Sequence, residues 1–151
     1  MPELCSQNVG SMNFAFRPLA KRYDTWKFDW ERDCVANSDP FIFRNTFREI
    51  ANVANTLDPQ CIRFEHECYD AGHLYNLQSG IDTGLIRAPN IIQFVFEILG
   101  GIGPEVDKLV FMKRTAASCL NPQATIHVLY SFKCSGPEAD AVQAKIAPGG
   151  Q

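Results

Sequence analysis

Residues 63 to 74 read Arg63-Phe64-Glu65-His66-Glu67-Cys68-Tyr69-Asp70-Ala71-Gly72-His73-Leu74. Alternate side chains of a strand point to opposite faces, so an extended stretch here places Glu65 and Glu67 on one face and mostly apolar residues on the other. Helical patterns flank the stretch on both sides, which favours a parallel strand over a half-solvated antiparallel one. A closed (β/α) barrel provides that environment, because its strands carry polar side chains near the mouth where substrates bind. The two glutamates are therefore candidate site residues.

The composition predicts a globular protein without a nucleic-acid or membrane partner. The chain has 151 residues, 46% of them hydrophobic, and a formal net charge of -3, so it carries no basic stripe that would attract nucleic acid or anionic lipid. No apolar run reaches the roughly 18 residues of a membrane-spanning helix, and the first residues lack a signal-peptide pattern, which predicts a cytoplasmic location. The six widely spaced cysteines are expected to be reduced and mostly buried.

Four strands and three helices are expected along the chain. The strands span about residues 3–9, 61–69, 91–99 and 125–130, and amphipathic helices span about 43–57, 73–83 and 104–120. A helix-start signal at Ser38-Asp39-Pro40 precedes the first helix, and residues 17–40 are interpreted as an excursion or a lid-like loop. Residues 135–151 are small, polar and rich in glycine and proline, and are predicted to be a flexible tail after a domain at 1–134.

The later three strands begin about thirty residues apart with a helix between each pair. This is the βαβ period, and right-handed crossovers then produce a parallel sheet. A complete eight-stranded barrel typically needs about 250 residues. The residues alone therefore leave two alternatives, an open four-stranded α/β unit or a partial (β/α)8 TIM barrel.

Four ordered segments resemble consecutive blocks of the β-keto acid cleavage enzymes, and they favour the partial barrel. They are residues 8–14 (NVGSMNF), 43–47 (FRNTF), 63–77 and 93–103 (QFVFEILGGIG). The resemblance implies a zinc-dependent (β/α)8 barrel that condenses a β-keto acid with acetyl-CoA, giving acetoacetate and a new CoA ester. The type member of the family acts on 3-keto-5-aminohexanoate in lysine fermentation, which is an amino-acid degradation pathway.

The resemblance also implies roles for particular residues. Glu67 matches the family's site glutamate and Ser6 matches a hydroxyl residue that contacts substrate, so both are predicted to be catalytic; Glu65 is the weaker candidate. Glu65 is predicted to bind substrate together with Ser11 and Asn13, which belong to the loop at the barrel mouth. A glycine-rich loop is predicted to bind an anionic group of the co-substrate through its backbone; its glycines are Gly100, Gly101 and Gly103. The alternatives are an ion pair with Arg63 for the glutamates and a tight turn for the glycines.

The zinc ligands of the family, a His-x-His pair and a late glutamate, have no counterpart in this sequence, so no metal ligand is predicted. His66, Cys68 and His73 are expected to be buried or capping residues rather than ligands. Two hypotheses follow. The chain is a segment of a β-keto acid cleavage enzyme that is inactive alone, or it is a non-catalytic α/β remnant that self-associates through open sheet edges. A homo-oligomer is the expected state.

Overall fold

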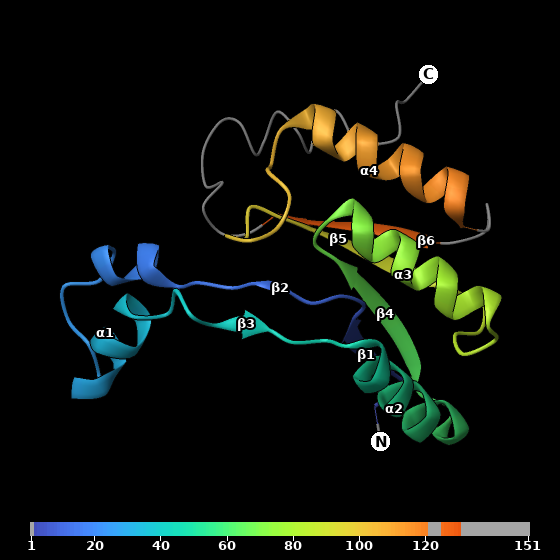
Figure 1. Ribbon diagram of the computed structural model, residues 1–151, viewed down its shortest axis with the longest axis horizontal. Helices are drawn as coiled ribbons and strands as arrows, with labels where there is room; N and C mark the ends of the chain where they lie inside the picture. The colour runs from blue at the N-terminus through green and yellow to red at the C-terminus, as the bar shows by residue number, and fades with distance from the viewer. Residues whose placement is uncertain (1, 121–124, 131–151) are drawn as a thin grey trace.

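A four-stranded parallel sheet forms the body of the molecule in the computed structural model, which describes residues 2–120 and 125–130 (Figure 1). Its strands are β1 (Leu4–Asn8), β4 (Arg63–Cys68), β5 (Ile91–Phe96) and β6 (Thr125–Tyr130), hydrogen-bonded in the order β1-β4-β5-β6. All three pairings are parallel. The predicted α/β class and the parallel direction of the strands are therefore confirmed.

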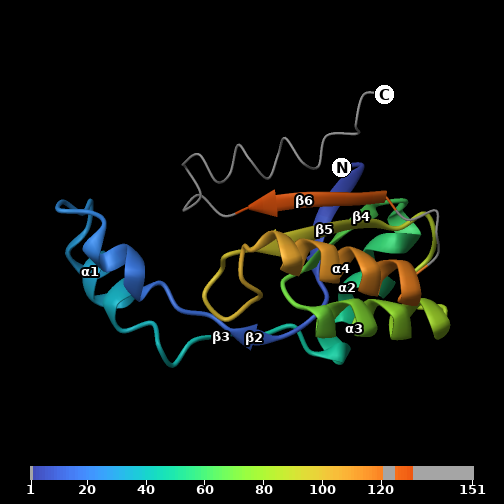
Figure 2. The same cartoon turned by 90° about the horizontal axis from the view of Figure 1, so that it is seen from above.

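Three helices cover one face of this sheet. They are α2 (Phe47–Leu57), followed by the short 3-10 helix η2 (Asp58–Gln60), α3 (Ala71–Asp82) and α4 (Val106–Cys119), and Figure 2 shows α3 and α4 on the same side of the strands. The core lies between the helices and the sheet, where Cys68, Ile92, Phe94 and Phe96 are fully buried against side chains of α3 and α4. Burial of this apolar surface is the main stabilising term of the fold.

The opposite face of the sheet is polar. Asn8, Glu67 and Gln93 stand opposite one another in register across β1, β4 and β5. Ser6, Glu65 and Ile91 form the neighbouring row toward the amino ends of the strands. Side chains alternate along each strand, so the residues next to them in the sequence, such as Ile92 and Phe94, point to the helices. The predicted division of residues 63–69 between a charged face and an apolar face is therefore correct.

Residues 12–43, which we call the arm, extend away from the sheet (Figure 1). The arm leaves and returns through an antiparallel pair, β2 (Met12–Asn13) and β3 (Ile42–Phe43), and contains the 3-10 helix η1 (Arg17–Lys21) and α1 (Asp29–Ala36). The predicted excursion is thus present, but it is folded. An Arg17–Asp39 ion pair at 2.7 Å and the buried Ser38, whose hydroxyl accepts from Phe16 N, close the arm on itself.

The predicted helix start at Ser38-Asp39-Pro40 is wrong. The helix begins at Phe47, and Phe43, which was expected on its apolar stripe, lies in β3. Thr46 is the N-cap: its hydroxyl accepts from Glu49 N at 3.4 Å, and Glu49 Oε2 accepts from Thr46 N at 2.9 Å. This capping box satisfies two amide donors at the helix start. Ser38 instead donates to Val35 O and binds the arm together.

The cysteines that the structure describes are free thiols, as expected, but most of these five are not buried. Among the five that the structure describes, all are free, and of these only Cys68 is buried, whereas Cys34 and Cys61 are exposed. Cys134 and the predicted tail at 135–151 lie outside the described residues. Within the described ranges, no helix is long and apolar enough to cross a membrane.

Candidate functional site

Glu67 lies near the carboxyl end of β4 on the polar face, where it is half-buried. Its Oε2 accepts a hydrogen bond of 2.5 Å from the hydroxyl of Tyr69, two residues along the chain. Burial raises the pKa of Tyr69, and the hydrogen bond to Glu67 raises it further. The phenol therefore stays protonated at neutral pH and holds the carboxylate in one orientation. This contact replaces the ion pair with Arg63 that was the alternative interpretation for Glu67.

Amide side chains flank Glu67 on the neighbouring strands. Asn8 on β1 and Gln93 on β5 are its partners in register, and both are half-buried. Asn8 Oδ1 is buried and has no hydrogen-bond partner in the part of the chain that the structure describes. A carboxylate between two amides can hold a small polar molecule in a fixed orientation. Alternation along β1 and β4 could have identified Asn8 and Tyr69, which the sequence analysis did not include among the site residues.

Ser6 and Glu65 are brought to the same face as Glu67, one row further from the carboxyl ends. Ser6 is exposed and stands opposite the half-buried Glu65 in the β1–β4 pairing. The structure therefore brings the two predicted catalytic residues, Ser6 and Glu67, together on adjacent strands. Their catalytic roles remain predictions.

Strand β4 ends at Cys68, and side-chain hydrogen bonds hold the turn that follows it. Asp70 is the N-cap of α3 and its carboxylate accepts from Gly72 N at 3.2 Å. The buried His73 ring accepts the amide N–H of Tyr69 through Nδ1 at 3.2 Å. Burial lowers the pKa of His73, so the ring is a neutral acceptor. His73 thus has the buried, capping role that was expected for it, and it fixes the backbone that carries Tyr69.

The loop after β5 meets the loop after β1 at the carboxyl end of the sheet. Gly100 has a φ of +109°, and a Cβ there would lie 1.9 Å from the carbonyl oxygen of Asn13. The amide of Ile102 donates to Tyr69 O at 2.7 Å. Both predicted loops therefore lie beside the end of β4 that carries Glu67. Parallel α/β proteins bind ligands at this position, among the loops at the carboxyl ends of the strands.

The two predicted loops nevertheless differ from the expected roles in detail. The Ser11 hydroxyl accepts from Asn45 N at 2.8 Å, which ties the loop to the start of α2, and Asn13 is exposed within β2. In the glycine-rich loop, Gly101 N donates to Ile98 O, and the carboxylate of Glu105 lies against Gly103. Helix α4 begins only at Val106, with Glu105 as its N-cap instead of Pro104 at the first position. A negative charge beside Gly103 disfavours an anion at that point.

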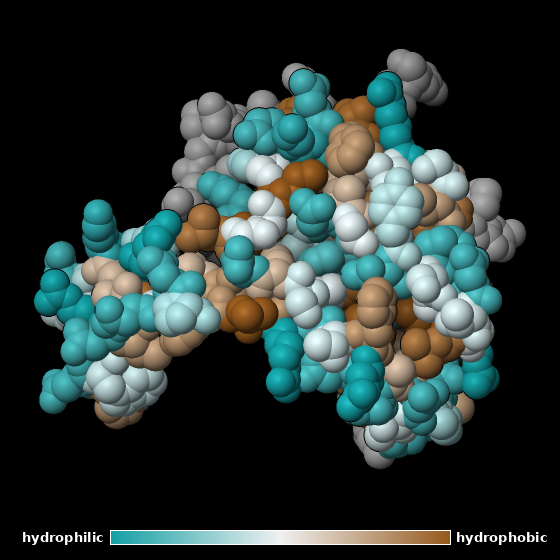
Figure 3. Space-filling model, in the orientation of Figure 1, coloured by the Kyte–Doolittle hydropathy of each residue, from teal (hydrophilic) through white to brown (hydrophobic). Residues whose placement is uncertain are grey.

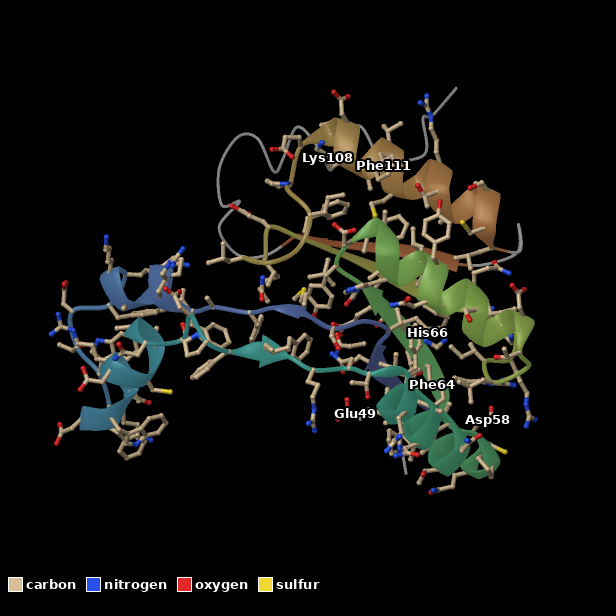
Figure 4. All side chains as sticks on the ribbon, viewed as in Figure 1. Glu49, Asp58, Phe64, His66, Lys108 and Phe111 are labelled. Atoms are coloured by element: carbon tan, nitrogen blue, oxygen red, sulfur yellow. The ribbon has the colours of Figure 1, made fainter. Side chains whose placement is uncertain are left out.

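Zinc ligands are not assembled by the residues that the structure describes. Among them, no group of three His, Cys, Asp or Glu side chains is arranged to hold a metal ion. His66 is 2% exposed on the helix-covered face, beside Phe64 in Figure 4, and burial lowers its pKa to about 4. The described donors therefore do not fit a zinc site.

Comparison with known proteins identifies the family of the chain. The family model described as beta-keto acid cleavage enzyme matches residues 1–151. A similar protein, 3,5-dioxohexanoate:acetyl-CoA acetone transferase of Paraburkholderia graminis, is 45% identical over 115 residues. That match covers 76% of this chain and 37% of the relative, so the chain spans little more than a third of the relative's length. On this evidence and on its parallel α/β fold, the chain belongs to the beta-keto acid cleavage enzyme family.

Proposed function

We propose that this chain forms part of the substrate pocket of an enzyme that cleaves a β-keto acid with acetyl-CoA. The observation that carries the proposal is the half-buried Glu67 carboxylate, fixed by Tyr69 and flanked by Asn8 and Gln93 at the carboxyl ends of parallel strands. The name of the Paraburkholderia relative supports acetyl-CoA as the second substrate.

In the proposed reaction, Glu67 takes a proton from the Cα of the β-keto acid, and this carbon forms a new bond to the acetyl carbonyl of acetyl-CoA. The CoA thiolate that leaves then attacks the keto carbonyl, and the bond between that carbonyl and Cα breaks. Glu67 returns its proton to Cα, which gives acetoacetate, while the remaining acyl group ends on the CoA sulfur. A general base must lie within hydrogen-bond reach of the proton it removes, and Tyr69 orients Glu67 for this role.

The neighbours of Glu67 are proposed to hold the substrate. Ser6 donates its hydroxyl to a substrate oxygen, and Gln93 offers a side-chain amide on the other flank. Glu65 is proposed to bind substrate from the row below. Zinc is expected from the family resemblance, and its ligands would come from outside the described residues.

The test is formation of acetoacetate and a CoA ester from 3,5-dioxohexanoate and acetyl-CoA by the purified chain, alone and mixed with the remaining strands of a family barrel. Glu67→Gln keeps the shape of the side chain and removes its basicity, so turnover should fall at least a hundredfold. Asp107→Asn, on the exposed side of α4, is the control and should leave turnover within twofold. Equal activity of the two variants would contradict the role of Glu67.

The competing hypothesis, a self-associating remnant, is favoured by one observation: among the residues that the structure describes, β1 and β6 are the end strands of the four-stranded sheet. Open strand edges pair readily with a second chain. Sedimentation distinguishes the two. A stable oligomer that makes no acetoacetate even with the missing strands supplied supports the remnant, and turnover that depends on Glu67 excludes it.

A further inference from the structure

A groove of about 510 Å³ runs between the arm and the loop after β5. Figure 3 shows apolar side chains, in brown, where the arm joins the body. The groove is outside the polar face that carries Glu67. Its walls are mostly aromatic and aliphatic, and they include Phe14, Phe16, Leu19, Tyr23, Ile98 and Leu99.

A series of ring contacts connects this groove to Glu67. Phe14 stacks on Phe43 with ring centroids 5.0 Å apart, and Phe43 meets the edge of Tyr69 at 6.0 Å. Tyr69 in turn donates to Glu67. The groove and the proposed reaction site are therefore neighbours, separated by the packed rings of Phe43 and Tyr69.

Arg22 places a positive charge on the lining of the groove. Arg22 lines the groove and is exposed, and it forms no ion pair within the described ranges. Lys21 precedes Arg22 in the chain, whereas Arg17 is already paired with Asp39. A guanidinium that no carboxylate pairs is a preferred partner for phosphate groups. Glu97 also lines the groove, so the phosphates would lie toward Arg22.

We propose that the groove between the arm and residues 97–99 binds a CoA thioester, with its pantetheine chain on the apolar walls, its phosphates at Arg22 and its acyl end toward Glu67. This assignment rests on the proposed function, which requires a CoA substrate. An apolar groove with an unpaired arginine in its lining matches a ligand that is neutral and flexible along its chain and strongly anionic at one end. It also moves the co-substrate from the glycine-rich loop, where Glu105 lies, to the arm.

The purified chain carries its own reporter for this site. Both tryptophans, Trp26 and Trp30, are in the arm, and Trp26 meets the edge of the groove residue Tyr23 with centroids 5.7 Å apart. Titration of CoA into a Trp30→Phe background, followed by the emission of Trp26, measures the dissociation constant directly. Pantetheine, which lacks phosphates, is the second probe.

Arg22→Glu should weaken CoA binding by at least tenfold and change pantetheine binding less than twofold, because only CoA carries the phosphates. Arg32→Glu changes the charge by the same amount on the exposed side chain of α1, outside the groove lining, and should change CoA binding less than twofold. Leu99→Asp places a charge on the apolar wall and should weaken both probes. Circular dichroism of each variant checks that the fold is retained.

No saturable binding of CoA at millimolar concentration, or equal weakening by Arg22→Glu and Arg32→Glu, would overturn the assignment. The proposed function fails separately. If Glu67→Gln lowers turnover but Arg22→Glu does not raise the KM for acetyl-CoA, only the groove assignment falls. If CoA binds in the groove as described but turnover is independent of Glu67, only the proposed chemistry falls.

Discussion

Substitution of Gly100 tests how the loop after β5 packs on the arm. Gly100→Ala would place a Cβ 1.9 Å from the carbonyl oxygen of Asn13, and this contact is with backbone, which no side-chain rotation can relieve. The residue also has a φ of +109°, where side chains other than glycine are strained by about 1–3 kcal/mol. Overpacking adds about 1–3 kcal/mol more. We therefore expect the free energy of unfolding to fall by about 2–6 kcal/mol.

Gly84→Ala is the matched control for this substitution. Gly84 also has a positive φ, +72°, but a Cβ there would meet nothing within 4 Å. The free energy of unfolding of Gly84→Ala should fall by only about 1–2 kcal/mol, which is the cost of the left-handed conformation for a residue with a side chain. Urea unfolding followed by far-ultraviolet circular dichroism gives both values, and tryptophan emission shows whether the arm separates first. If the two variants lose the same stability within about 0.5 kcal/mol, the close packing of Gly100 on Asn13 is wrong.

Three further predictions concern stability and pH. Burial keeps His66 neutral with a pKa of about 4, whereas the unfolded chain takes up a proton near 6.5; stability is therefore fully present above pH 6.5 and falls by roughly 3 kcal/mol as the pH drops to 4. Urea titrations across this range should show a shallower loss for His66→Gln, and parallel curves would refute the assignment. Thr46→Ala removes the capping box of α2 and should cost about 1 kcal/mol in urea unfolding, with Thr56→Ala, inside the same helix, costing clearly less. Tyr69→Phe deletes the hydrogen bond to Glu67 and should cost about 1 kcal/mol in stability while lowering turnover; unchanged turnover would show that Tyr69 does not orient Glu67.

Local sequence patterns were enough to predict the sheet and the covering helices. The alternation around Glu67 and the thirty-residue βαβ spacing depend only on side-chain periodicity and the handedness of crossovers, and both are seen in β4, β5 and β6. The same alternation placed Glu65 and Glu67 on one face, whereas Ser6 was predicted only from the family resemblance. The alternation of polar and apolar residues was therefore enough to predict the face of the strand on which each of these glutamates lies.

The arm and the start of α2 could not be predicted in the same way. Ser38-Asp39-Pro40 has the composition of a helix start, but Thr46 and Glu49 form the capping box because β3 first pairs with β2, thirty residues earlier in the chain. That pairing is a tertiary contact, which overrides local preference. The Phe14–Phe43–Tyr69 ring contacts and the groove depend on the same pairing, so no single stretch of sequence indicates them.

A crystal structure of the chain with bound acetoacetate, the proposed product, tests the central claim most directly. We predict that the ligand lies on the polar face of a parallel sheet, with an oxygen or the Cα carbon in contact with Glu67 and with Tyr69 still donating to the carboxylate. Acetoacetate bound elsewhere, or a Glu67 side chain that points into bulk solvent, would contradict the account.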